Sequence, residues 1–184
     1  MENVILASQS PRRKELLHYL VEEFRIMPAD IDESVLTGED PAAYVLRMAQ
    51  EKGEKIAKDH REALVIASDT IVVHEGQILG KPQNREDAFK MLQQMSGKTH
   101  HVYTGVALQQ GEKRRTALTE ASVSFYELTE AEINRYLDSG EYADKAGAYG
   151  IQGRASVFVK AVQGDYYSIV GFPVGAVNQM LKEF

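Results

Sequence analysis

The segment Val4-Ile5-Leu6-Ala7-Ser8-Gln9-Ser10-Pro11-Arg12-Arg13-Lys14 joins a short apolar run to the start of a helix. The apolar run predicts a buried strand. Ser10 followed by Pro11 predicts a helix with a serine N-cap and a proline at its first position, where proline is well tolerated. A buried strand that leads directly into a helix is typical of α/β proteins.

Three cations, Arg12, Arg13 and Lys14, fall in the first turn of that helix. Cations are unfavourable at the positive end of the helix dipole, by a few tenths to about 1 kcal/mol each. Free N–H groups at a helix N-terminus bind anions. With the hydroxyls of Ser8 and Ser10 alongside, the cluster indicates a phosphate site. The alternative is a tolerated surface cluster whose arginines point to solvent.

The composition is that of an ordinary globular protein, with 184 residues, 43% hydrophobic and 26% charged. We therefore expect one domain over residues 1–184 with a sizeable core. The net charge of -6 argues against a nucleic-acid polymer as partner, and a local basic site in an acidic chain favours a small anion. The absence of cysteine excludes disulfides and thiolate sites.

The N-terminus carries no basic-then-apolar signal pattern, and no apolar run approaches about 18 residues. We expect a cytoplasmic protein that does not span a membrane. The state of assembly is left open, and a homodimer is one option.

Strand and helix signals intermix along the chain. Strands are expected over 4–7, 24–27, 63–67, 71–73, 77–79, 101–109, 116–126 and 156–162. Helices are expected over 11–20, from Pro41, from Asn84 to near Gly97, from Thr129 to Gly140 and from Pro173. Hairpins in the middle of the chain favour an α/β fold with a mixed sheet. Neither a dinucleotide fingerprint nor a Walker lysine motif is present.

Asp69 is the leading catalytic candidate, because it stands just past the carboxyl end of the apolar run 63–67, where α/β proteins place ligand contacts. A carboxylate there can hold a divalent cation or take a proton from water. Alternatively it caps the next turn. Glu33, beside Asp30 and Asp32, offers a second acidic group, and Mg²⁺ prefers one or two carboxylates with phosphate oxygens. Taken alone, such an acidic loop is more often only solvated surface.

Lys81 and Lys52 could neutralise polyphosphate charge, although a lone helical lysine such as Lys52 is usually solvated. His100 and His101 point to opposite faces of a strand and are not expected to share a metal. The glycine-rich segment 144–153 suits close backbone approach or simple turns. Within it, the amide of Gln152 could match the donor–acceptor edge of uracil or thymine.

Five blocks in order extend these motifs: Ala67-Ser68-Asp69-Thr70, Leu79-Gly80-Lys81-Pro82, Ser96-Gly97-Lys98-Thr99-His100, Tyr103-Thr104-Gly105-Val106 and 144–153. With Ser8-Gln9-Ser10-Pro11-Arg12-Arg13-Lys14-Glu15-Leu16-Leu17, the chain resembles the Maf family of septum-formation-inhibitor-like nucleotide pyrophosphatases over essentially its full length.

The resemblance implies a mixed, elongated sheet flanked by helices, with two lobes and a central cleft, similar to the inosine-triphosphate pyrophosphatase fold. It implies metal-dependent hydrolysis of nucleoside triphosphates to monophosphate and pyrophosphate, with Asp69 as proton acceptor. The positions matching the family's phosphate and metal site are Ser8, Arg13, Glu33, Lys52 and Lys81. Those matching its substrate choice are Arg12, Thr70 and Gln152, and this trio is similar to the dTTP/UTP subgroup.

We therefore expect Mg²⁺ or Mn²⁺ to be held by Glu33 and Asp69 while water attacks the α-phosphorus. Whether Asp69 acts as base or metal ligand stays open. One alternative is a pyrophosphatase for modified or inosine-type nucleotides. Another is a non-enzymatic, nucleotide-sensing regulator of septum formation.

Overall fold

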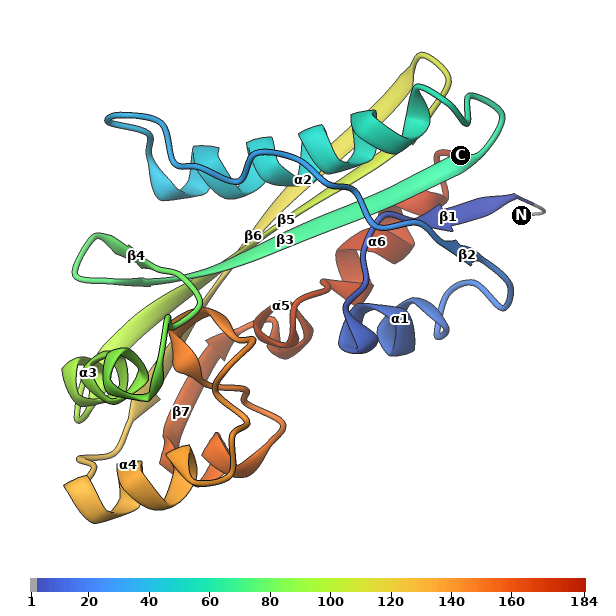
Figure 1. Cartoon of the computed structure of the whole chain (residues 1–184). Coiled ribbons are helices and arrows are strands. Elements are labelled where there is room, and N and C mark those ends of the chain that lie inside the picture. The colour runs from blue at the N-terminus through green and yellow to red at the C-terminus, as the bar shows by residue number, and fades with distance from the viewer. Residues whose placement is uncertain (1–2) are drawn as a thin grey trace. The chain divides into compact units, whose positions relative to one another are not determined.

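The computed structural model describes residues 3–184, and its described strands form one mixed sheet. The strand order is β2-β1-β3-β5-β6-β7, with β4 paired to β3 (Figure 1). The strands are β1 (Val4–Leu6), β2 (Arg25–Ile26), β3 (Leu64–His74), β4 (Gln77–Leu79), β5 (Thr99–Gln110), β6 (Lys113–Phe125) and β7 (Val159–Gly164). Because β1 pairs in parallel with β2 and β3 while β3 pairs antiparallel with β4, the predicted mixed α/β class is confirmed.

The helices follow the predicted caps closely. They are α1 (Pro11–Leu17), α2 (Pro41–Ala57), α3 (Arg85–Met95), α4 (Glu130–Leu137), α5 (Tyr166–Val170) and α6 (Val174–Leu181), with 3-10 turns η1 (Ala146–Ala148) and η2 (Arg154–Phe158). Ser10 and Asn84 cap their helices, and Thr129 and Glu132 form a capping box. Within residues 3–184, none of these helices has the length and apolar character needed to cross a membrane.

The chain folds as two compact units. The first comprises the described residues up to Thr70 together with Thr104–Thr119 and Gly171–Phe184. The second comprises Ile71–Tyr103 and Glu120–Val170. The three long strands β3, β5 and β6 each contribute residues to both units.

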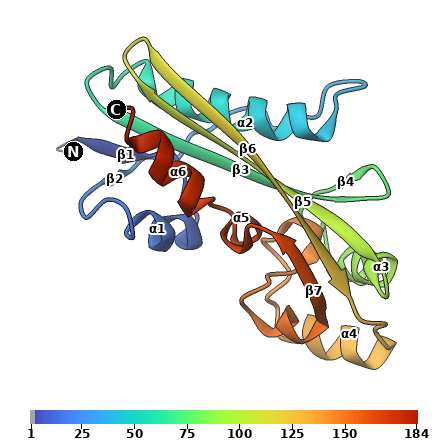
Figure 2. The same cartoon turned by 180° about the vertical axis from the view of Figure 1, so that it is seen from behind.

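In the first unit, α2 covers one face of the sheet, whereas α1 and α6 lie on the other (Figures 1 and 2). The core under α2 is built from small and β-branched side chains, namely Ile5, Ala7, Ala57, Ala63, Val65 and Ala67. Gly105 on β5 lets α2 approach the sheet, because a Cβ there would lie 2.7 Å from the carbonyl oxygen of Val45.

Strand β3 corrects the expectation that a strand ends before Asp69. The runs 63–67 and 71–73 belong to one continuous strand, Leu64–His74, and Asp69 lies inside it. The β-branched residues Ile71, Val72 and Val73 continue the buried pattern, so the three polar residues Ser68, Asp69 and Thr70 do not end the strand. The expected site at a strand's carboxyl end is nevertheless present, since β1 ends at Leu6, whose partner on β3 is Ile66. Asp69 and Thr70 lie just beyond that last pair.

The second unit encloses a cluster of aromatic rings. Phe125 packs edge-on against Tyr149, Phe158 and His100 with ring centroids 4.8–6.0 Å apart. Gly147 adopts a left-handed φ of +66°, and a Cβ there would lie 3.0 Å from Val72. At this glycine, close packing and an unusual turn therefore explain the sequence without a ligand.

Three smaller expectations differ from the structure. Strand β7 begins at Val159 rather than 156, because η2 occupies the preceding residues. Helix α1 ends at Leu17 rather than near 20. The short helix α5 was not predicted, since five residues are too few to show a helical period.

Candidate functional site

A lysine bridges two carboxylates in the first unit. The Lys52 Nζ atom lies 2.7 Å from Glu33 Oε1 and 2.7 Å from Asp69 Oδ1. The Lys52 and Asp69 side chains are 11% and 14% exposed, whereas that of Glu33 is 56% exposed. Two carboxylates contributed by a loop and a strand thus converge on one cation supplied by α2.

Lys52 lies on the buried side of α2, although a lone helical lysine is usually solvated. Lys52 is 8% exposed and has Ala49 and Gly53 as buried neighbours, while Lys55 is exposed. A lysine is rarely buried unless it is paired, and here both carboxylates provide the pairing. The alternative that Lys52 is a solvated residue on the helix surface is therefore wrong.

Arg13 is the centre of a second polar group. Its Nε donates to the Gly171 carbonyl oxygen at 2.9 Å, Nη1 donates to Ser8 Oγ at 3.3 Å, and Nη2 donates to Thr70 Oγ1 at 3.3 Å. The three contacts come from three separate parts of the chain. They fix the guanidinium plane, as only an arginine fork can do.

The N-terminus of α1 places Arg13 as the sequence predicts. Ser10 Oγ accepts from the Arg13 backbone N–H at 3.4 Å, and Ser8 Oγ accepts from the Ser10 N–H at 3.2 Å. Lys14 is exposed, while Arg12 and Arg13 are partly buried. The arginines are therefore not a cluster turned wholly to solvent.

The charges of the two groups influence one another. Burial lowers the pKa of the Arg13 guanidinium, and the Asp69 and Glu33 carboxylates oppose that shift. Asp69 reaches toward α2 while the adjacent Thr70 reaches toward Arg13, as the alternation of side chains along a strand requires. The Arg13 group and the Lys52 group thus occupy neighbouring positions beyond the end of β1.

Thr70 is itself held by a buried partner. Its Oγ1 lies 2.9 Å from Thr104 Oγ1, and Thr104 is fully buried on β5. Ser68 Oγ donates to the same Gly171 carbonyl that Arg13 uses, at 3.1 Å. These hydroxyls anchor the residues that hold Arg13.

Two predicted residues belong to the second unit. Lys81 and Gln152 are both exposed there, and Gln152 lies between η1 and η2. Their roles stay predictions, as does the specificity role of Arg12. His100 is fully buried while the His101 side chain is 47% exposed, which confirms that they point to opposite faces.

Sequence reasoning missed five residues around the site: Tyr44, Arg47, Ser68, Thr104 and Gly171. The Tyr44 hydroxyl donates to the Glu33 carbonyl at 2.7 Å, and Arg47 Nη2 donates to the Ser34 carbonyl at 3.0 Å. The spacing of three between Tyr44 and Arg47 places them on one helix face and was a usable signal. No pattern in the sequence indicated the contacts of Thr104 and Gly171.

No group of three or more histidine or acidic side chains within residues 3–184 could hold a metal. Lys52 binds two carboxylates, those of Glu33 and Asp69. Two carboxylates suit Mg²⁺, which takes its remaining ligands from water and substrate phosphates.

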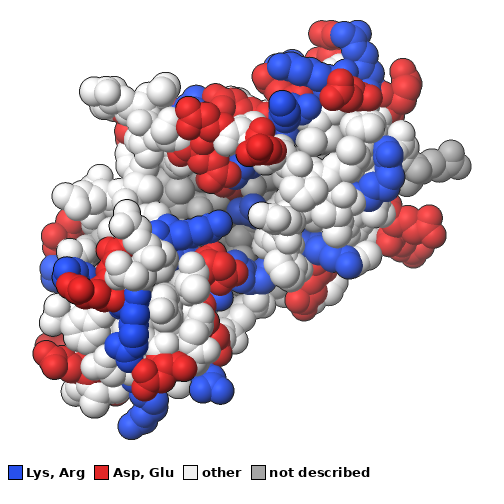
Figure 3. All heavy atoms as spheres, in the orientation of Figure 1, with Lys and Arg blue, Asp and Glu red and all other residues white. Residues whose placement is uncertain are grey.

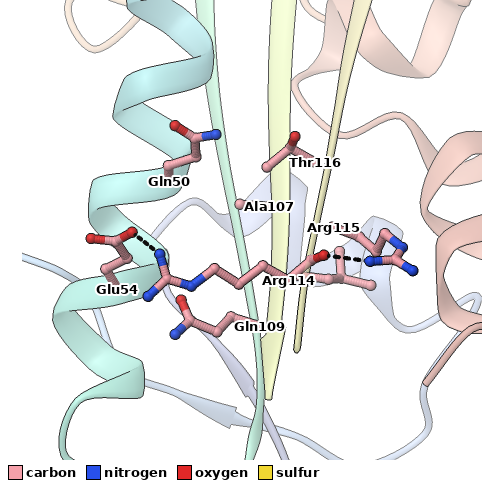
Figure 4. A pocket seen from close by; sticks show the side chains of 8 residues that line it. Gln50, Glu54, Ala107, Gln109, Arg114, Arg115 and Thr116 are labelled. Carbon is pink, nitrogen blue, oxygen red and sulfur yellow. Dashed lines mark hydrogen bonds and ion pairs between the residues drawn. The ribbon is translucent and has the colours of Figure 1, made fainter. Parts of the chain in front are cut away.

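A pocket of about 260 Å³ opens elsewhere in the first unit, between α2, β5 and β6 (Figure 4). It is lined by Gln50, Glu54, Ala107, Leu108, Gln109, Arg114, Arg115 and Thr116. Arg114 extends to Glu54 of α2, with which it forms an ion pair. The pocket includes no predicted site residue, so we do not assign the chemistry to it.

Acidic and basic side chains are intermixed over the face drawn in Figure 3. The charge relevant to a ligand therefore comes from individual groups such as Arg13 and Lys52. Together the fold and these groups define a class, an α/β protein with a polar site suited to an anion beyond the end of a parallel strand.

The comparisons with known proteins name the family. The model of the Maf-like protein family matches residues 3–184, and the chain belongs to the Maf family. A dTTP/UTP pyrophosphatase of Bacillus cereus (strain G9842) is 47% identical over 184 residues, covering 100% of this chain and 96% of the relative. A dTTP/UTP pyrophosphatase of Latilactobacillus sakei subsp. sakei (strain 23K) is 47% identical over 178 residues, covering 97% and 98%.

A solved structure of a HAM1 protein from Coxiella burnetii aligns with a TM-score of 0.54 over 100% of both chains. Its identity to this chain is 13%, so the likeness concerns the fold alone.

Proposed function

We propose that the protein hydrolyses dTTP and UTP to the nucleoside monophosphate and pyrophosphate. Full-length relatives named dTTP/UTP pyrophosphatase, at 47% identity, support this assignment. The family match over 3–184 supports the proposal that residues 1–184 act as one nucleotide pyrophosphatase domain. We assign the activity to the cytoplasm, where nucleotide pools are used.

The observation that carries the mechanism is the pair of carboxylates that meet at Lys52 Nζ. Because Lys52 brings the Glu33 and Asp69 carboxylates together through one oxygen of each, their remaining oxygens would hold a divalent cation, Mg²⁺ or Mn²⁺. That cation would supply charge neutralisation of the substrate phosphates.

The chain's own residues supply the rest of the chemistry. Arg13 and Ser8 bind phosphate oxygens. Asp69 orients the attacking water or accepts its proton, and Lys52 offsets the charge that develops as pyrophosphate leaves. Arg12, Thr70 and Gln152 are proposed to choose the base. Lys81 is proposed to offset phosphate charge.

The test is a panel of dTTP, UTP, ITP and 7-methyl-GTP at equal concentration, with the products identified. We expect pyrophosphate from dTTP and UTP, and little turnover of the other two. Asp69→Asn should abolish turnover while the protein stays folded. Preference for ITP or 7-methyl-GTP would overturn the pyrimidine assignment, and near-normal turnover by Asp69→Asn would overturn its catalytic role.

Further proposals are tested separately. Gln152→Ala should relax the preference for dTTP over ITP, and Lys81→Gln should slow turnover. Sedimentation of the pure protein tests the homodimer.

A further inference from the structure

We propose that Tyr44 and Arg47 of α2 are positioning residues that hold Glu33 in place to receive the divalent cation. The inference rests on the proposed function, because it concerns the cation site formed by Glu33 and Asp69. It assigns a role to two side chains that touch neither the carboxylate of Glu33 nor the phosphates.

Glu33 needs such support because of where it lies. The chain between Ile26, the last residue of β2, and Pro41, the first of α2, forms neither helix nor strand. In Figure 1 this segment runs back along α2. The Glu33 side chain is 56% exposed, so core packing does not fix it. A ligand on an irregular, exposed segment loses conformational entropy when it binds, unless other contacts have already ordered it.

Tyr44 holds the backbone of Glu33 itself. Its hydroxyl donates to the Glu33 carbonyl oxygen at 2.7 Å, and the residue is only 7% exposed. Because the Tyr44 side chain is buried, packing holds its hydroxyl in place against the Glu33 carbonyl.

Arg47 holds the next part of the segment at two points. Nη2 donates to the Ser34 carbonyl at 3.0 Å, while Nε and Nη2 form a two-pronged ion pair with Glu39 at 2.6 and 2.7 Å. Glu39 also accepts from the Leu36 N–H at 3.0 Å. The hydrogen bonds from Arg47 lower the pKa of Glu39 to about 2, so the pair stays charged.

The contacts form one continuous arrangement along α2. The Arg47 guanidinium lies 5.5 Å from the centre of the Tyr44 ring, which suits a cation–π contact. Tyr44 and Arg47 hold the consecutive carbonyls of Glu33 and Ser34, and Lys52 binds the Glu33 carboxylate. One helix thus fixes both the backbone and the side chain of Glu33. Mutating residues that orient the ligands of a metal in this way commonly changes metal affinity 10- to 100-fold.

The experiment measures Mn²⁺ binding by the whole protein with 2′-deoxyuridine 5′-(α,β-imido)triphosphate, using the electron paramagnetic resonance signal of free Mn²⁺. Tyr44→Phe removes only the hydroxyl, and Arg47→Gln removes the ion pair. We expect each to weaken Mn²⁺ binding about 10-fold. The matched control is Arg114→Gln, which breaks an ion pair with Glu54 on the same helix and should bind Mn²⁺ as the unaltered protein does.

A second series separates positioning from general destabilisation. In a Glu33→Gln background, Tyr44→Phe and Arg47→Gln should cause no further loss of Mn²⁺ affinity, because their effect passes through Glu33. Equal losses in both backgrounds would overturn the positioning role. If Glu33→Gln weakens binding while Tyr44→Phe leaves it unchanged, the role also fails although the cation site stands. If Glu33→Gln itself binds normally, the proposed cation site fails, and the positioning role with it.

Discussion

At Lys52, one ammonium group serves two carboxylates from different parts of the chain. This arrangement makes the lysine both a counter-ion for the free protein and a cation available to a phosphate. A neutral residue of similar length removes both effects. Glu33 and Asp69 would then repel each other without a shared counter-ion.

Lys52→Gln should therefore lower the turnover of dTTP on the order of 10²-fold, the scale seen when one preorganised electrostatic group is lost. Lys55→Gln, three residues along the same helix on an exposed site, should turn over dTTP normally. Initial rates of pyrophosphate release measure both. Similar losses in the two variants would show that Lys52 has no special role.

The candidate site residues could be predicted where the evidence for them lies in their immediate sequence neighbours. Ser10, Pro11 and Arg13 are adjacent, so capping and helix-dipole arguments located them. Thr104 lies 34 residues from Thr70, and Gly171 lies 158 residues from Arg13. No spacing rule brings such residues together, because their contact is made by the sheet.

At the scale of elements, the packing of α2 on β5 sets where Lys52, Tyr44 and Arg47 lie. Gly105 allows the approach, since an added Cβ would meet the Val45 carbonyl at 2.7 Å and Leu46 Cα at 3.1 Å. These neighbours are backbone atoms and cannot turn aside. A larger residue must push the helix outward.

Gly105→Ala should therefore lower the free energy of unfolding by about 1–3 kcal/mol, as overpacking does, and slow turnover by displacing Lys52. Gly175→Ala on α6 is the control, because nothing lies within 4 Å of its added Cβ. That substitution should be neutral or stabilising, by up to about 1 kcal/mol. Urea unfolding of both variants checks the comparison, and an unaltered Gly105→Ala protein would contradict the packing argument.

Helix starts were predicted well because Asn84, Thr129 and Glu132 act on their immediate neighbours. Strand ends were predicted less well. Asp69 and Thr70 interrupt an apolar pattern and suggested a boundary, yet β3 continues through them. The hydrogen bonds of a sheet come from neighbouring strands, so a pair of polar side chains does not determine where a strand stops.

At the scale of the whole molecule, the buried His100 gives stability a dependence on pH. His100 is fully buried and its Nε2 lies 2.7 Å from the Tyr149 hydroxyl. Burial lowers the pKa of His100 to about 3, with a smaller effect from His74. Unfolding returns the imidazole to an ordinary pKa near 6.5.

Below about pH 6.5, the His100 imidazole binds a proton in the unfolded chain but stays neutral in the folded protein. The free energy of unfolding should therefore fall as the pH drops below about 6.5. The loss approaches about 1.4 kcal/mol per pH unit down to about pH 3. Urea unfolding at pH 7, 6 and 5 should show a shallower dependence for His100→Gln than for His101→Gln, whose altered side chain is exposed. Equal slopes would refute the assignment to His100.

The first unit is assembled from three separate stretches of chain, and the last begins at Gly171. The Gly171 carbonyl oxygen accepts hydrogen bonds from both Arg13 and Ser68, which are synthesised far earlier than Gly171. The Arg13 guanidinium therefore cannot make all of its hydrogen bonds while Gly171 is still within the ribosome. By that point, all residues of the second unit, up to Val170, have already been synthesised. Until Gly171 has emerged, the nascent chain carries Arg13 without its hydrogen bond to the Gly171 carbonyl, so the proposed nucleotide site is incomplete before that point of synthesis.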